Sequence, residues 1–146
     1  MSQVLKGQVA LVTGASSGFG VGMAKQLAIN GATVYIMARR TEKLAQIADE
    51  TGAVSVTGDV TKTKDWDHVF EQILKEKGRL DIFINNAGGG GPIKPVEEQD
   101  DSAILNTIQI NLTGAILGCK RAAAIMKKQK SGTIINVSSI CAIKAW

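Results

Sequence analysis

The sequence is poor in the residues and runs on which several classes of protein depend. Its two cysteines, Cys119 and Cys141, show no CxxC and no Cys/His spacing, and its one histidine, His68, falls on an expected surface helix. A disulfide framework and the usual zinc sites are therefore excluded. No uncharged apolar run reaches membrane-spanning length, and Lys6 and Gly7 interrupt any N-terminal signal core. We expect a cytoplasmic protein with reduced thiols, no metal ion and no contact with a membrane.

What is present is an ordinary globular composition. Of 146 residues, 45% are hydrophobic and 21% charged, which suits a single domain over residues 1–146 and argues against disorder. The net charge of +4 is modest, and the only basic cluster, at 127–130, falls at a helix end where cations suit the dipole. We therefore expect no nucleic-acid partner, although the charge fits a small ligand that carries phosphate.

Short apolar runs alternate with amphipathic segments of helix length. The runs are continuous stretches rich in Val and Ile, which is typical of strands buried on both faces. The alternation predicts an α/β protein with a doubly wound parallel sheet covered by helices on both sides. The expected strands are 8–13, 33–38, 53–57, 81–85 and 133–137, and the expected helices are 18–30, 42–50, 62–77 and 100–128.

A glycine-rich segment, TGASSGFG at 13–20, follows the first strand and opens the first helix. Glycines at such a turn let backbone N–H groups approach a pyrophosphate, and the helix N-terminus favours the negative charge. The spacing is neither GxGxxG nor a P-loop. The candidate cofactor-binding residues in this segment are Gly14, Ser16, Ser17, Gly18, Phe19 and Gly20.

The residues after the second and third strands indicate which dinucleotide the site would bind. An acidic residue after the second strand would bind the ribose of NAD, but this chain has Arg39 and Arg40. Guanidinium groups pair with a 2′-phosphate, so NADP is favoured over NAD; the alternative is two solvent-facing charges at a helix start. Asp59, after the third strand, could accept a hydrogen bond from adenine or cap the next helix, and we favour the ligand role.

The expected helix over 100–128 has two apolar sides. Ile104, Leu105, Ile108, Leu112, Ile116, Cys119, Ala123 and Met126 form one stripe at helical spacing, and Ile110, Leu117 and Ile125 form a second side. Packing of the stripe against the sheet explains one side. The second side has no partner in that arrangement, so we expect a homo-oligomer that associates through this helix.

Taken in order, these motifs resemble the short-chain dehydrogenase/reductase family across essentially the whole chain. The glycine segment resembles the family's TGxxxGxG loop, and Asp59 with Val60 resembles its adenine-contacting pair. Asn86, Ala87 and Gly88 belong to an NNAG segment that in the family lines the cofactor. The resemblance implies a Rossmann-type sheet of order 3-2-1-4-5-6-7. It also implies hydride transfer between a nicotinamide and a small alcohol or carbonyl substrate.

The resemblance also implies catalytic residues, and one part of the family's set is absent. By motif position Asn111 matches the asparagine that holds a water of the proton relay, and Ser139 matches the serine that binds the substrate oxygen. The family's Tyr-x-x-x-Lys motif does not occur, because the only tyrosine, Tyr35, lies within an expected strand. Loss of general acid–base catalysis typically costs ~10²–10⁴ in rate.

The sequence thus predicts the family's fold truncated after the fifth strand, which leaves an apolar edge at 133–137. We expect either that the natural chain is longer or that another polypeptide completes the sheet. The favoured interpretation is an NADP(H)-dependent oxidoreductase whose catalysis needs the missing motif. The alternative is a non-catalytic dinucleotide-binding module, or a fragment completed by a partner chain.

Overall fold

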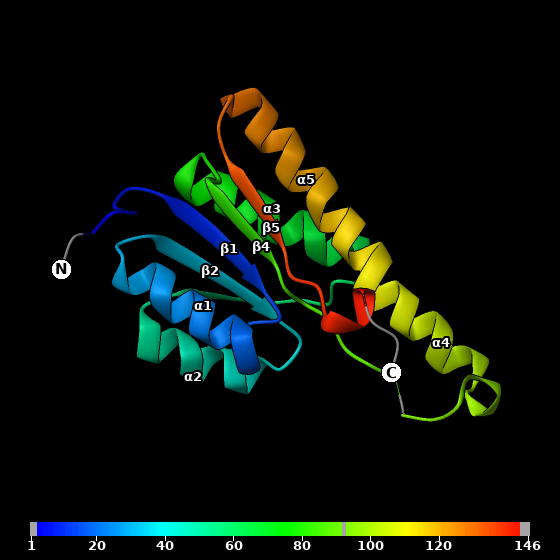
Figure 1. The fold of residues 1–146 in the computed structure, drawn as a ribbon. Helices are drawn as coiled ribbons and strands as arrows, with labels where there is room; N and C mark the ends of the chain where they lie inside the picture. The colour runs from blue at the N-terminus through cyan, green and yellow to red at the C-terminus, as the bar shows by residue number, and fades with distance from the viewer. Residues whose placement is uncertain (1–2, 92, 144–146) are drawn as a thin grey trace.

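The computed structural model describes residues 3–91 and 93–143, which form one parallel sheet of order β3-β2-β1-β4-β5 (Figure 1). The α/β doubly wound fold and this strand order are confirmed. β1 is buried along its whole length, as its unbroken apolar sequence predicts. The strands are β1 (Val9–Thr13), β2 (Thr33–Ala38), β3 (Val54–Thr57), β4 (Ile82–Asn85) and β5 (Thr133–Asn136).

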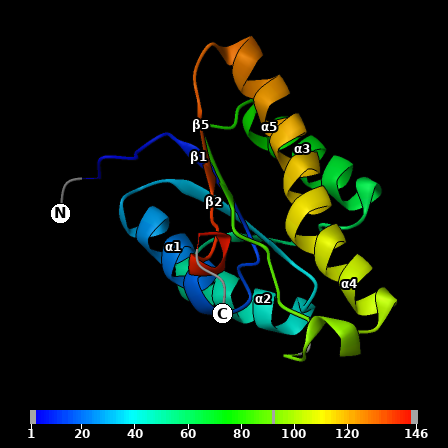
Figure 2. The same ribbon diagram turned by 45° about the vertical axis from the view of Figure 1, so that its right-hand side comes forward.

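Helices cover both faces of the sheet, and the side chains of successive strand residues point to opposite faces. On β1, Leu11 packs in a core with the helices α3 and α5, whereas Val12 packs in a second core with α1 and α2. Figures 1 and 2 show these two pairs on opposite sides. The helices are α1 (Gly18–Ile29), α2 (Thr41–Thr51), α3 (Thr63–Lys77), α4 (Asp101–Ile108) and α5 (Gly114–Gln129), with short turns η1 (Val96–Glu98), η2 (Gln109–Thr113) and η3 (Ile140–Ala142).

The long helix departs from the prediction in two ways. It is interrupted by η2, a π-helical turn, so that α4 and α5 are separate segments. The side that faces the sheet is also not the predicted stripe: Leu105, Leu112 and Ile116 are 65%, 57% and 58% exposed. The prediction that this stripe packs against the sheet is therefore wrong for these three residues; of the stripe, Met126 is buried in the core. Leu117 and Ile125, from the side expected to be free, pack instead against the core.

Small residues explain why α5 turns this side to the sheet. Its buried positions are Gly114, Gly118, Ala122 and Met126, spaced by four residues. A Cβ on Gly118 would lie 2.7 Å from the Trp66 ring and 2.8 Å from the Phe83 ring. The helix axis can approach these aromatic residues only because glycine has no side chain. A hydrophobicity pattern gives weight to large residues and misses such a face.

The segment from α4 to α5 is the one candidate membrane span by length and hydropathy among the described residues. In this fold, however, α5 packs against α3 and the sheet. Arg121 on α5 donates a hydrogen bond of 2.7 Å to Asp67 on α3, and Gly118 lies against the sheet core. The exposed apolar residues of this segment therefore form a surface beside a packed helix.

Candidate functional site

A cleft of about 310 Å³ opens at the carboxyl ends of the strands. It lies beside the end of β1, which has β2 as its neighbour on one side and β4 on the other. This is the usual ligand position in open α/β sheets. Its volume is at the lower end of the roughly 300–1,000 Å³ typical of ligand sites. The lining residues are Gly14, Ser16, Ser17, Met37, Ala38, Arg39, Arg40, Gly58, Asp59, Val60, Ala87, Gly88, Gly89, Gly90, Asn106, Thr107 and Ile110.

Two glycines of the loop after β1 have no room for a side chain. Gly14 has φ +66°, and a Cβ there would lie 2.8 Å from the Ala87 Cα. A Cβ on Gly20 would lie 2.5 Å from the Gly14 carbonyl oxygen and 2.9 Å from Asn86 Nδ2. The loop and the start of α1 therefore pack directly on the segment after β4. This contact leaves the N-terminal end of α1 next to the cleft, where Ser17 lines it.

The other candidates in this loop differ in position. Ser16 and Ser17 line the cleft, whereas Gly18, with φ +58°, does not. Phe19 is 83% exposed and lies outside the lining. Gly20 is buried beneath the loop and acts on the cleft through packing. Of the six predicted residues, three line the cleft: Gly14, Ser16 and Ser17.

The segment after β4 is held to β1 by hydrogen bonds. Thr13 Oγ1 accepts bonds of 3.0 Å from the backbone N–H groups of Asn86 and Ala87, and Asn86 Nδ2 donates to the Thr13 carbonyl at 2.9 Å. Ala87 and Gly88 line the cleft, and Asn86 supports them. Sequence reasoning missed the role of Thr13, although its hydroxyl at the end of β1 was the available signal.

Arg39 and Arg40 both line the cleft but differ in their contacts. The Arg40 guanidinium donates four hydrogen bonds to the glycine loop: Nε to Ser16 Oγ at 3.2 Å, and Nη2 to Ser16 Oγ, the Ser16 carbonyl and Ser17 Oγ at 2.9, 3.3 and 2.7 Å. Arg39 forms no side-chain hydrogen bond with any described residue. The cleft therefore has one cation held by the protein and one open to a ligand.

Asp59 lies in the cleft lining and also closes a turn of the backbone. Its Oδ1 accepts hydrogen bonds from the Thr61 backbone N–H and hydroxyl at 2.9 and 2.8 Å, which closes the turn before α3. It also lines the cleft together with Val60. The capping contact is with the turn and not with α3 itself, because α3 begins at Thr63.

The two candidate catalytic residues lie outside the cleft lining. Asn111 is part of the π-helical turn, where Oδ1 accepts from the Gly89 N–H at 3.0 Å and Nδ2 donates to the Gly89 carbonyl at 2.6 Å. It thereby holds a loop that lines the cleft. Ser139 is exposed after β5, and its carbonyl accepts a bond of 3.0 Å from the Ala142 N–H.

Other residues bear on the chemistry of the cleft. Tyr35 is buried and donates to Glu76 at 2.6 Å; burial, together with that carboxylate, raises the pKa of Tyr35 well above its usual range.

Asn106, Thr107 and Ile110 line the cleft from the α4 side, which sequence reasoning missed because it treated this helix as scaffold. Among the described residues no group of His, Cys, Asp or Glu could hold a metal ion.

Known proteins share both the sequence pattern and this fold. A borneol dehydrogenase of Lavandula x intermedia is 37% identical over 136 residues, which cover 92% of this chain and 52% of that protein. A metagenomic short-chain oxidoreductase solved with NADP has a TM-score of 0.93 and 33% identity, covering 98% of this chain and 67% of its own. A xylitol dehydrogenase solved with NAD⁺ has a TM-score of 0.91 and 28% identity, covering 97% and 56%.

The chain spans about half the length of the curated relatives it matches. The family model described as short chain dehydrogenase matches residues 8–146, which include every cleft segment described above. The same strand order and the same glycine loop after β1 accompany that match. The chain therefore belongs to the short-chain dehydrogenase/reductase family of oxidoreductases.

Proposed function

We propose that this protein is an NADP(H)-dependent oxidoreductase that interconverts a small alcohol and the corresponding carbonyl compound. The observation that carries the proposal is Arg39, which lines the cleft directly after β2 and has no side-chain hydrogen bond to a described residue. A guanidinium group there pairs with a 2′-phosphate and gives no acceptor to a free ribose hydroxyl. The related structures carry NADP in one case and NAD⁺ in another, which supports a nicotinamide dinucleotide of either kind.

The residues present fit such a cofactor. The glycine loop offers backbone approach at Gly14 and a helix N-terminus at Ser17, which suit a pyrophosphate. Asp59 and Val60 would lie beside the adenine, and Ala87 and Gly88 would line the part of the cleft after β4. When bound, the nicotinamide would supply the hydride acceptor or donor. Residues 1–146 would thus serve as a single dinucleotide-binding domain.

Ser139 and Asn111 take the proposed roles toward the substrate. Ser139 would donate a hydrogen bond to the substrate oxygen. Asn111 would hold the proton-relay water and also hold the 88–91 loop through its two hydrogen bonds to Gly89. Proton transfer needs a Tyr-x-x-x-Lys motif that these residues lack, since Tyr35 is buried and bonded to Glu76. The second candidate is a dinucleotide-binding module without turnover, and adding NADPH and carbonyl substrates and measuring turnover separates it from the first.

Arg39→Ala is expected to remove the preference for NADP. Loss of a guanidinium–phosphate pair should weaken NADPH binding by about 10- to 100-fold, since a charge-assisted hydrogen bond contributes about 1.5–3 kcal/mol. NADH lacks the 2′-phosphate, so its affinity should change by less than about threefold. Fluorescence titration with both cofactors measures the ratio. A ratio equal to that of the unmodified protein would rule out selection by Arg39.

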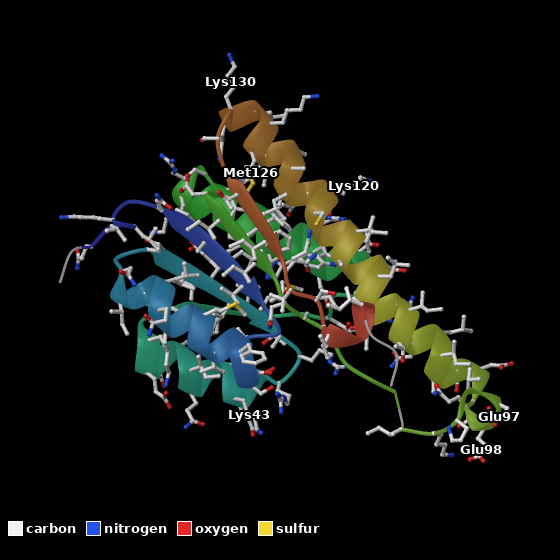
Figure 3. All side chains as sticks on the ribbon, viewed as in Figure 1. Lys43, Glu97, Glu98, Lys120, Met126 and Lys130 are labelled. Carbon is white, nitrogen blue, oxygen red and sulfur yellow. The ribbon has the colours of Figure 1, made fainter. Side chains whose placement is uncertain are left out.

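The exposed stripe of α4 and α5 is proposed to pair with a second copy of the chain. Leu105, Ile108, Leu112 and Ile116 are each 47–65% exposed along one helical segment. The ends of this segment are complementary in charge: Figure 3 shows Glu97 and Glu98 before one end and Lys130 at the other. An antiparallel pair would place acidic residues opposite basic ones and bury the stripe.

Leu112→Glu tests that pairing. A buried carboxylate at the centre of the stripe should raise the dimer dissociation constant by about 30-fold or more, the size of an interface hot spot. Light scattering over a range of concentrations measures it. Ala124→Glu is the matched control, because Ala124 is exposed on α5 outside the stripe. An unmodified protein that stays monomeric at high concentration would contradict the proposed dimer.

A further inference from the structure

Arg40 holds the N-cap residue of α1 in place of the usual capping contact. Ser17 is the N-cap of α1, and serine there usually accepts a hydrogen bond from an N–H of the first turn. In the described chain Ser17 makes no such capping bond. Its Oγ accepts a hydrogen bond of 2.7 Å from Arg40 Nη2 instead. The first-turn N–H groups of α1 are thus left without their nearest side-chain acceptor.

The same guanidinium holds the neighbouring serine. Nε and Nη2 of Arg40 converge on Ser16 Oγ at 3.2 and 2.9 Å, and Nη2 also reaches the Ser16 carbonyl at 3.3 Å. Arg40 therefore fixes two consecutive residues of the glycine loop from the β2–α2 side of the cleft. Arg39, also in the lining, has no such contact with a described residue.

These contacts have a consequence for an anionic ligand. A pyrophosphate at the N-terminus of α1 would accept hydrogen bonds from the same backbone N–H groups that donate to a capping serine. A serine that caps its own helix competes with the ligand. A serine held away leaves the donors unpaired and oriented. The protein thus forgoes a cap that would stabilise α1, which is expected where a binding site is pre-organised.

We propose that Arg40 is a positioning residue that withdraws the Ser17 hydroxyl from the N-terminus of α1 and so keeps these N–H groups available for the cofactor's pyrophosphate. Arg39 is then the residue that discriminates the 2′-phosphate, and the two arginines have separate functions. This inference rests on the proposed dinucleotide function. It concerns a part of the cofactor that NADPH and NADH share, so it is independent of the preference between them.

The test combines Arg40→Ala with Ser17→Ala and measures affinity for NADPH and NADH. Arg40→Ala alone should weaken both cofactors by the same factor, about 5- to 10-fold, because Ser17 is then free to cap α1. Ser17→Ala alone measures what the Ser17 hydroxyl itself contributes to binding, and it is the reference for the double variant. The double variant should recover most of the loss, because the competing hydroxyl is gone. Lys43→Ala is the control and should keep both affinities. Lys43 is an exposed cation in the first turn of α2 (Figure 3), and it forms no hydrogen bond or ion pair with a described residue.

A second readout needs no cofactor. In the ligand-free protein, Arg40→Ala should slow amide hydrogen exchange at Phe19 or Gly20 several-fold, because the N-cap hydroxyl bonds to the second or third N–H of a helix. Adding Ser17→Ala should reverse that slowing. Unchanged exchange would overturn the inference even if the protein bound no dinucleotide, whereas failure of the unmodified protein to bind either cofactor would refute the proposed function.

The affinities discriminate further. A loss confined to NADPH would make Arg40 a direct ligand of the 2′-phosphate and overturn the positioning role. A double variant that binds more weakly than Arg40→Ala would also overturn it, since the effects would then be additive and Ser17 would be a favourable contact. Equal losses for both cofactors, with recovery in the double variant, would establish it.

Discussion

Gly20→Ala should lower the affinity for NADPH and NADH by at least about 100-fold or abolish binding, while leaving most of the fold intact. The added Cβ would lie 2.5 Å from the Gly14 carbonyl oxygen and 2.9 Å from the Ala15 Cα, and these backbone atoms belong to the loop that lines the cleft. Relief of the clash must move the loop or the start of α1, and a displacement of about 1 Å is enough to cost 100-fold at a positioned site. Fluorescence titration measures the affinity, and circular dichroism checks the fold.

Gly22→Ala is the matched control for that change. Gly22 lies in the same helix, and a Cβ there meets nothing within 4 Å. Alanine should keep the affinity and stabilise the protein by roughly 0.5–1 kcal/mol, because glycine is the poorer residue in a helix interior. Two alanine substitutions only two residues apart should therefore differ sharply. Equal cofactor binding by both variants would show that the loop packing does not shape the site.

Gly118→Val should destabilise the protein by about 3 kcal/mol or more. The added atoms overlap the Trp66 and Phe83 rings, which lie 2.7 and 2.8 Å from the position of the new Cβ. Overpacking of a close-packed core typically costs about 1–3 kcal/mol and occasionally more, and the clash with two aromatic rings places this site at the upper end. The free energy of unfolding in urea measures the effect.

Ala124→Val is the control for Gly118→Val, because Ala124 is an exposed residue of the same helix. Its effect should stay within about 0.5 kcal/mol, as for other surface substitutions. If the two variants unfolded at the same urea concentration, α5 would not be held against the sheet through its glycine face. That outcome would also remove the reason why the stripe at Leu112 is exposed.

The sheet and the position of the cleft follow from patterns that are local in sequence. Each strand is a short Val- and Ile-rich run, and helices end where glycine permits a left-handed residue, as at Gly52 and Gly78 with φ +70° each. The loop at 13–20 adjoins β1 in sequence, so strand order alone brings it to the edge of the sheet. Such features could be predicted because the residues concerned are neighbours along the chain.

Features that depend on contacts between distant residues could not be predicted. The exposed side of α5 is decided by Gly118 against Trp66 and Phe83, and a hydrophobicity pattern contains no measure of that fit. The sequence around Asn111 gives no sign of a π-helical turn. Arg40 lines the cleft, but its hydrogen bonds to the glycine loop join residues more than twenty positions apart in the sequence and could not be predicted.

Hydrogen exchange in the presence of saturating NADPH is the most direct test of the proposed dinucleotide site, since it locates the ligand on the chain. Bound NADPH should slow exchange only in the five segments that line the cleft, near residues 14–17, 37–40, 58–60, 87–90 and 106–110. The same concentration of NADH should protect these segments less. Exchange rates that do not change when NADPH is added would contradict a dinucleotide site in this cleft. Protection only along α4 and α5 would contradict it too.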